Sequence, residues 1–178
     1  SRDAKRFQYE RFILSQLLVM ALKGVPAFYL PALLASENDI KSFSMTGQRR
    51  DLNREKFKSE NLSAVLNNPE SNANKNLKYL RNAMDVRSKL KQFHPCSEMK
   101  CLSKGRSDIV VIKRGKGPES VFAIHNMTEN KINYQLNDND LPKIIDNDFN
   151  THDFLTSTKY NCKNISLDPF QVIWLSAL

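Results

Sequence analysis

The sequence has few of the residues that usually hold metal ions or build disulfide frameworks. It contains three cysteines and three histidines in 178 residues. Cys96 and Cys101 do not have the spacing of a CxxC zinc knuckle, and no HExxH motif joins the histidines. These absences predict reduced cysteines in ordinary packing, and they indicate neither a metal site nor a cofactor.

The sequence also has no apolar run long enough to cross a bilayer. Its most apolar stretch, residues 12–22, is interrupted by Ser15 and Gln16 and falls short of the roughly 20 apolar residues that a membrane span needs. Basic residues precede it as they precede the core of a signal peptide, but the interruptions favour a buried helix. We therefore expect no membrane partner and a protein of the cytoplasm. A chain that opens within a helix also suggests a fragment.

Basic residues outnumber acidic ones, by 27 to 19. Clustered basic side chains are typical of nucleic-acid binding, because they release counterions from phosphates. Here the charge is scattered, and Asp85 and Asp108 interrupt the densest basic stretches, residues 78–91 and 100–116. The pattern is typical of a solvated surface, so we expect no nucleic-acid partner.

The apolar residues of the amino-terminal part are spaced first as in a helix and then as in a buried strand. Between residues 7 and 22, apolar side chains recur at steps of three and four, which predicts a helix with a wide buried face. Gly24 is placed to end it. Residues 25–30 form a short continuous apolar run, which predicts an interior strand of a parallel sheet.

The next segment, residues 36–58, is polar and predicts a surface loop of the kind that often carries function. Two helices are expected after it, at residues 61–66 and 76–91, from the spacing of their apolar residues.

After Pro95 the period changes. Short β-branched or aromatic runs occur at residues 109–112, 121–124, 132–136 and 172–175, separated by residues that favour turns. This pattern predicts a small antiparallel sandwich or barrel between about residue 95 and residue 178, with Trp174 buried in it.

Several strings occur together in the order that is typical of one enzyme family. They are GVPAFY at residues 24–29, Leu33-Leu34, Asn38-Asp39, Gly47, DLNREK at 51–56, Arg87, FHP at 93–95, VFAIHN at 121–126 and LDPFQVIWL at 167–175. Together they resemble the carboxyl-terminal part of the sucrose phosphorylases and glucosylglycerate phosphorylases, a branch of the α-amylase clan. The resemblance extends over nearly the whole chain.

The resemblance implies an α+β fold, with the last β/α unit of a (β/α)8 TIM barrel followed by a C-terminal antiparallel β-sandwich. Residues 1–92 would form the barrel end, with helix 7, strand 8, the active-site loop and helix 8. Residues 93–178 would form the sandwich domain. Barrel enzymes assemble their sites at the carboxyl ends of the strands, so residues 36–58 are expected on the active-site side.

The resemblance also implies a set of substrate-binding residues in this loop: Arg54, Asp51, Asn53, Asn38 and Asp39. Arg54 is the clearest match to the family's motif. A guanidinium suits sugar binding, because its planar fork donates paired hydrogen bonds to vicinal hydroxyls or to a carboxylate that holds them. The alternative is that Arg54 and Asp51 form an ion pair that only braces the loop.

By the same resemblance, the catalytic carboxylates of a retaining mechanism belong to barrel strands that precede Ser1. The parent enzyme would transfer a glucosyl group from sucrose or a related glucoside to phosphate, and this chain alone would be inactive. Its partners would be a small sugar substrate and phosphate. The alternative from another class is a free-standing basic β-sandwich that binds a ligand without catalysis.

Overall fold

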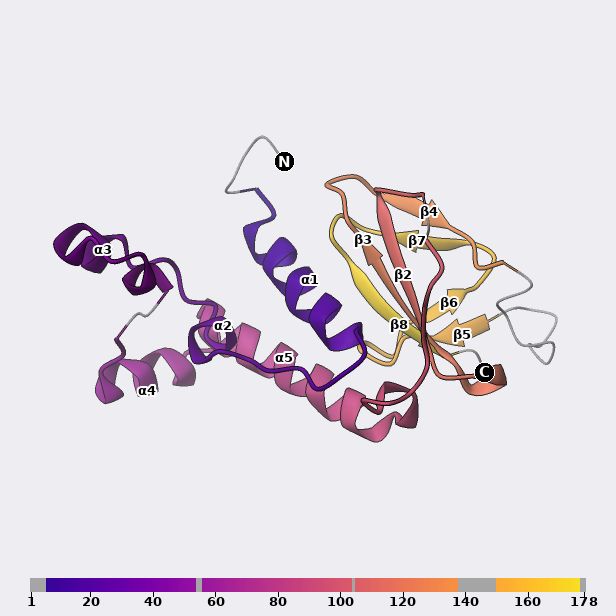
Figure 1. The fold of residues 1–178 in the computed structure, drawn as a ribbon, viewed down its shortest axis with the longest axis horizontal. Helices are drawn as coiled ribbons and strands as arrows, with labels where there is room; N and C mark the ends of the chain where they lie inside the picture. The colour runs from indigo at the N-terminus through magenta and orange to yellow at the C-terminus, as the bar shows by residue number, and fades with distance from the viewer. Residues whose placement is uncertain (1–5, 54–55, 104, 138–149, 177–178) are drawn as a thin grey trace. The chain divides into compact units, whose positions relative to one another are not determined.

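The computed structural model describes residues 6–53, 56–103, 105–137 and 150–176 (Figure 1). The chain divides into two compact units. The first comprises residues 1–26 and 83–178, and the second comprises residues 27–82. The proposed boundary of the parent enzyme's domains, near residue 92, stays a proposal, and contacts within the first unit cross it.

The first unit begins with helix α1, Gln8–Ala21, as the apolar period predicts. Its buried side chains share one face: Ile13, Leu14, Leu17, Met20 and Ala21. The helix gives way to extended backbone at Leu22, and Gly24 follows with a φ of 112°. That positive φ is strained for a residue with a side chain, which explains why glycine follows the end of the helix.

The largest sheet of this unit has four strands in the order β1-β2-β3-β8. They are β1 (Met99–Cys101), β2 (Ile109–Arg114), β3 (Val121–Asn126) and β8 (Val172–Ser176), and each neighbouring pair is antiparallel. Two smaller antiparallel pairs complete the strands, namely β4 (Ile132–Tyr134) with β7 (Ile165–Leu167) and β5 (Asn150–His152) with β6 (Lys159–Asn161). The short 3-10 helices η2 (Lys91–Phe93) and η3 (Gly117–Glu119) lie in the connections.

One face of the four-stranded sheet packs against the β4–β7 pair and its flanking residues. The core between them consists of Ile109, Val111, Phe122, Ile124, Leu136, Cys162, Ile165, Leu167, Ile173 and Leu175, all fully buried. Alternate residues of each strand supply it, as the pleat of a sheet requires. The prediction of antiparallel strands around an apolar core is therefore confirmed, and Trp174 is fully buried.

The opposite face of the same sheet is also buried. Ala123, His125 and Trp174 alternate with the core residues above and are fully buried. Helix α1 contacts β3 on this side of the unit (Figure 1). The ring of Phe93, from η2, lies 4.6 Å from that of Trp174 between centroids. The sheet therefore has apolar contacts on both faces.

The free edge of strand β8 is paired with the residues that follow β5. Asp153 forms a bridge with Leu175, and its carboxylate accepts a hydrogen bond of 2.7 Å from the backbone N–H of Trp174. The carboxylate also accepts from the Leu155 N–H and the Thr156 hydroxyl. Burial raises the pKa of Asp153, and these donors partly offset that rise by stabilising the charged form.

The second unit is helical. It contains α2 (Leu30–Leu33), α3 (Ile40–Thr46), the 3-10 helix η1 (Arg49–Asn53), α4 (Ser59–Asn67) and the start of α5 (Asn72–Lys89). The helices predicted at residues 61–66 and 76–91 are confirmed as α4 and α5, with longer amino-terminal ends. Asn76 is fully buried, and its amide donates to the carbonyl oxygens of Ala32 and Leu33 at 2.9 and 2.8 Å. Asn76 therefore ties α2 to α5.

The strand predicted at residues 25–30 is wrong for this structure. Residues 25–29 have no regular structure, and Leu30 begins α2. A buried parallel strand needs a neighbour on each edge, and every strand in the described part of the chain begins at or after Met99 and pairs with another strand of that part. The side chains stay accessible as a result, and Val25 is 79% exposed. Whether this segment belongs to a barrel in a larger protein stays a proposal.

Candidate functional site

The candidate site begins where Asp39 caps helix α3. Its carboxylate accepts a hydrogen bond from the Ser42 backbone N–H at 2.9 Å and from the Ser42 hydroxyl at 2.5 Å. An aspartate at this position satisfies a donor that the first turn of a helix leaves free. The Ser42 hydroxyl, followed by its backbone N–H, lowers the pKa of Asp39. The carboxylate is therefore charged and already engaged by its own helix.

The 3-10 helix η1 returns the chain to the start of α3. The Asp39 N–H donates to the carbonyl oxygen of Leu52 at 2.7 Å, and the Thr46 hydroxyl donates to the Asp51 carboxylate at 2.6 Å. Gly47 makes the reversal possible with a φ of 67°. Residues 38–39 and 51–53 are thus brought together.

The five residues that the resemblance assigns to substrate binding have different surroundings. Asp39 and Asp51 are partly exposed and hydrogen-bonded within the segment. Asn38 and Asn53 are exposed. Arg54 lies outside the described residues. Their role in binding a sugar stays a proposal.

A shallow hollow of about 650 Å³ opens beside this segment. The residues that line it include Glu37, Asn38, Asp39, Lys41 and Lys56. Carboxylates and amides accept hydrogen bonds, and the lysines donate them. The hollow can therefore offer both kinds of partner to a polyhydroxyl ligand.

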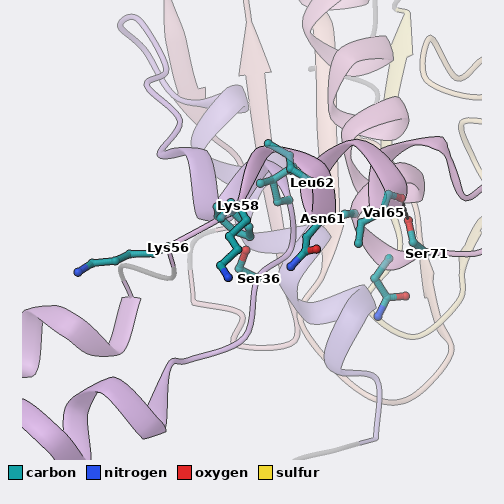
Figure 2. A pocket seen from close by; sticks show the side chains of 11 residues that line it. Ser36, Lys56, Lys58, Asn61, Leu62, Val65 and Ser71 are labelled. Carbon is teal, nitrogen blue, oxygen red and sulfur yellow. Dashed lines mark hydrogen bonds between the residues drawn. The ribbon is translucent and has the colours of Figure 1, made fainter.

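A second hollow of the same unit, of about 500 Å³, was not apparent from the sequence. Ser36, Lys58 and Asn61 line it, and Figure 2 shows Lys56 extending away from them. Leu62 and Val65 from α4 add apolar surface. The only signal in the sequence was the apolar spacing of α4, which does not reveal that a concave surface forms beside it.

Two negative findings apply to the described residues. No group of three or more His, Cys, Asp or Glu side chains in them is arranged to hold a metal ion. Among the same residues, no helix combines the length and apolar character needed to cross a bilayer.

Solved structures with the same fold belong to enzymes that act on carbohydrates. One is the trehalose-6-phosphate hydrolase of Bacillus licheniformis, with a TM-score of 0.68 and 16% sequence identity. The match covers 98% of this chain and 40% of the hydrolase chain. Another is the α-amylase of Geobacillus thermoleovorans, with a TM-score of 0.67 and 18% sequence identity. That match covers 94% of this chain and 33% of the α-amylase chain. The fold is therefore that of part of an α-amylase-like enzyme.

Sequence comparison identifies the branch. A glucosylglycerate phosphorylase of Allomeiothermus silvanus is 31% identical over 129 residues, which cover 72% of this chain and 23% of that protein. A glucosylglycerate phosphorylase of Escherichia coli is 22% identical over 165 residues, which cover 93% of this chain and 28% of that protein. No family model matches the chain. The chain belongs to the glycoside phosphorylase branch of the α-amylase clan and corresponds to a partial carboxyl-terminal region.

Proposed function

We propose that this chain is the carboxyl-terminal part of a glycoside phosphorylase that transfers a glucosyl group from a glucoside to phosphate with retention. The observation that carries the proposal is the 31% identity over 129 residues to a glucosylglycerate phosphorylase. The chain spans about a quarter of that protein's length. Glucosylglycerate is the first donor to test, and sucrose is the second.

In the proposed reaction the bond between the anomeric carbon and the leaving oxygen breaks, and a phosphate oxygen finally takes the place of that leaving group. Retention requires a carboxylate nucleophile and a second carboxyl that acts as acid and then base. Asp39 and Asp51 are poor candidates for these roles, because both carboxylates bind hydroxyl groups of their own segment. We therefore assign the catalytic carboxylates to the part of the enzyme outside this chain.

The role proposed for this chain is to hold the glucosyl unit. The hydrogen bonds of Asp39 and Asp51 fix both ends of the segment, so that Asn38 and Asn53 are presented from a defined backbone. Arg54, which follows Asn53 in the sequence, is proposed to bind the same sugar. Fixed donors lower the entropy lost on binding and orient the sugar for attack.

The test joins residues 1–178 to the amino-terminal part of the Allomeiothermus silvanus enzyme, in place of that enzyme's matching region. With glucosylglycerate and phosphate, this chimera should release glucose 1-phosphate, whereas the 178-residue chain alone should release none. A chimera that melts cooperatively but forms no glucose 1-phosphate from either donor would contradict the proposal.

A matched pair of variants tests the binding segment. In the chimera, Arg54→Ala should lower kcat/KM by about a hundredfold or more, because a charged hydrogen bond in a binding site is worth several kcal/mol. Arg49→Ala, in the same segment, is the control and should stay within about threefold of the parent. Equal effects of the two variants would leave Arg54 without a specific role.

A further inference from the structure

The first unit has a hollow that does not involve residues 36–58. Its volume is about 530 Å³. The connection after β1 supplies Arg106, strand β4 and the residues after it supply Asn133, Tyr134, Gln135 and Asn137, and the turn between β6 and β7 supplies Asn164. All of these residues belong to the first unit.

Four of the nine described residues that line this hollow carry carboxamide groups. Asn133, Gln135, Asn137 and Asn164 are all exposed. Each carries one carbonyl acceptor and an NH2 group with two donors. Asn133 and Gln135 are two residues apart, so the alternation of the strand turns both away from the core that Tyr134 packs against. The outward side of β4 and of the residue that follows it therefore offers paired donors and acceptors.

Arg106 is held in place at the same hollow. Its Nε donates to one Asp108 carboxylate oxygen at 2.9 Å, and its terminal nitrogen donates to the other. The guanidinium also lies over the Tyr134 ring, 5.6 Å from the centroid. The bidentate bond raises the pKa of Arg106 and lowers that of Asp108, so both stay ionised and their charges offset each other. The described residues that line the hollow include no aspartate or glutamate.

We propose that this hollow binds a neutral saccharide. Vicinal hydroxyls of a sugar ring both donate and accept, as do the carboxamides, and they need no compensating charge. A cation would find no carboxylate in the lining. An anion would find Lys163, but Asp108 already offsets the charge of Arg106. The site is a binding site without catalysis, and it does not depend on the glycosyl transfer proposed above.

The experiment records side-chain NH2 signals of the 15N-labelled 178-residue chain by NMR during titration with maltotriose. The signals of Asn133, Gln135 and Asn164 should shift and saturate at concentrations of about 1–10 mM, as expected for an open polar site. Inorganic phosphate at the same concentrations is the anionic probe and should leave these signals in place. No shift with maltotriose up to about 50 mM, or a shift caused by phosphate alone, would overturn the proposal.

A double variant and a matched control complete the test. Asn133→Ala with Gln135→Ala should weaken maltotriose binding by about tenfold or more, since two hydrogen bonds are lost. Asn150→Ala removes an exposed carboxamide elsewhere in the same unit and should leave binding unchanged. The melting temperature should be the same in all three proteins. Equal binding by the double variant and the control would overturn the proposal, whatever the chimera does in the phosphorolysis assay.

Discussion

At the residue scale, His125 shows how burial controls protonation. It lies in β3 with no exposed surface, and its Nδ1 is 3.3 Å from the carbonyl oxygen of Val110. Burial lowers its pKa from 6.5 to about 4. The unfolded chain binds this proton more readily than the folded chain, so acid favours unfolding. The contribution to stability is complete above pH 6.5 and is lost as the pH falls toward 4.

We predict that lowering the pH from 7 to 5 costs the chain about 2 kcal/mol of unfolding free energy through His125 alone. His125→Gln should remove most of this pH dependence, whatever its effect on absolute stability. Chemical denaturation of both proteins at the two pH values measures the difference. His152→Gln changes an exposed histidine and is the control. An unchanged pH dependence in His125→Gln would refute the assignment.

Asn76 gives a second prediction at this scale. Asn76→Ala should remove the side-chain hydrogen bonds to the carbonyl oxygens of Ala32 and Leu33, at a cost of about 1–3 kcal/mol. The Ala32 oxygen would keep the Ala35 N–H as a donor. Hydrogen exchange at the Leu33 and Leu34 amides, which bond within α2, should become faster. Lys78→Ala lies on an exposed position of the same helix and should change neither quantity. Protection that survives in Asn76→Ala would show that α2 is held by other contacts.

At the scale of elements, two arginines donate hydrogen bonds to the backbone carbonyl oxygens at the carboxyl end of α1 and just after it. Arg114, fully buried in β2, donates to the carbonyl oxygens of Ala21 and Leu22 at 3.0 and 2.6 Å. Arg87 donates to those of Met20 and Gly24, each at 2.9 Å. The last carbonyls of a helix lack partners within it and carry its negative end, so cations are favoured there.

We predict that Arg114→Met destabilises the chain by about 3 kcal/mol, because the side chain also donates to the His94 carbonyl oxygen and three buried or partly buried hydrogen bonds are lost. The His94 oxygen keeps a second donor, the Ser97 N–H. Arg114→Lys should recover only part of this loss, since an ammonium lacks the planar fork. Thermal melting followed by circular dichroism gives the ranking. Lys131→Met, at an exposed lysine, should melt like the parent chain. A ranking with Lys no better than Met would show that packing, and not hydrogen bonding, is what Arg114 supplies.

The period of the sequence predicted the helices and strands that owe their stability to an apolar face. The helix at residues 7–22 and the strands at 109–112, 121–124 and 172–175 are all present within a few residues. The strand predicted at residues 25–30 was wrong. A continuous apolar run indicates a segment that can be buried, but it does not show which other segment would bury it. Likewise the polar loop at 36–58 concealed α3 and η1, whose ends depend on the hydrogen bonds of Asp39, Thr46 and Asp51.

The candidate site was predicted from the sequence only as a set of residues near one another. The motif order placed Asn38, Asp39, Asp51 and Asn53 in one loop, and the hydrogen bond from Asp39 to Leu52 agrees with that grouping. The hollow beside α4 and the hollow beside β4 could not be predicted. A concave surface depends on segments that are distant in sequence, and no local pattern records it.

At the scale of the whole molecule, the exposed apolar side chains matter most. Val25, Met45 and Ile40 are 79%, 78% and 66% exposed. We predict that the chain expressed alone self-associates, because each large apolar side chain left in water forgoes roughly 1.5–3 kcal/mol of burial. The double change Val25→Lys with Met45→Lys should shift the population toward monomer. Light scattering after size-exclusion chromatography measures the mass, and Lys23→Ala with Lys41→Ala is the control. A monodisperse monomer of the parent chain would contradict the prediction.

Arg114 also constrains the order in which parts of the chain can fold during synthesis. Its acceptors at the end of α1 and just after it, Ala21 and Leu22, lie 93 and 92 residues earlier. The ribosome delivers α1 long before β2, so the carbonyls of Ala21 and Leu22 depend on water until the guanidinium arrives. Closing so long a loop is slow compared with forming a helix. Helix and sheet therefore reach their final state together, late in translation, and a nascent chain stalled before residue 114 should leave the end of α1 open to protease.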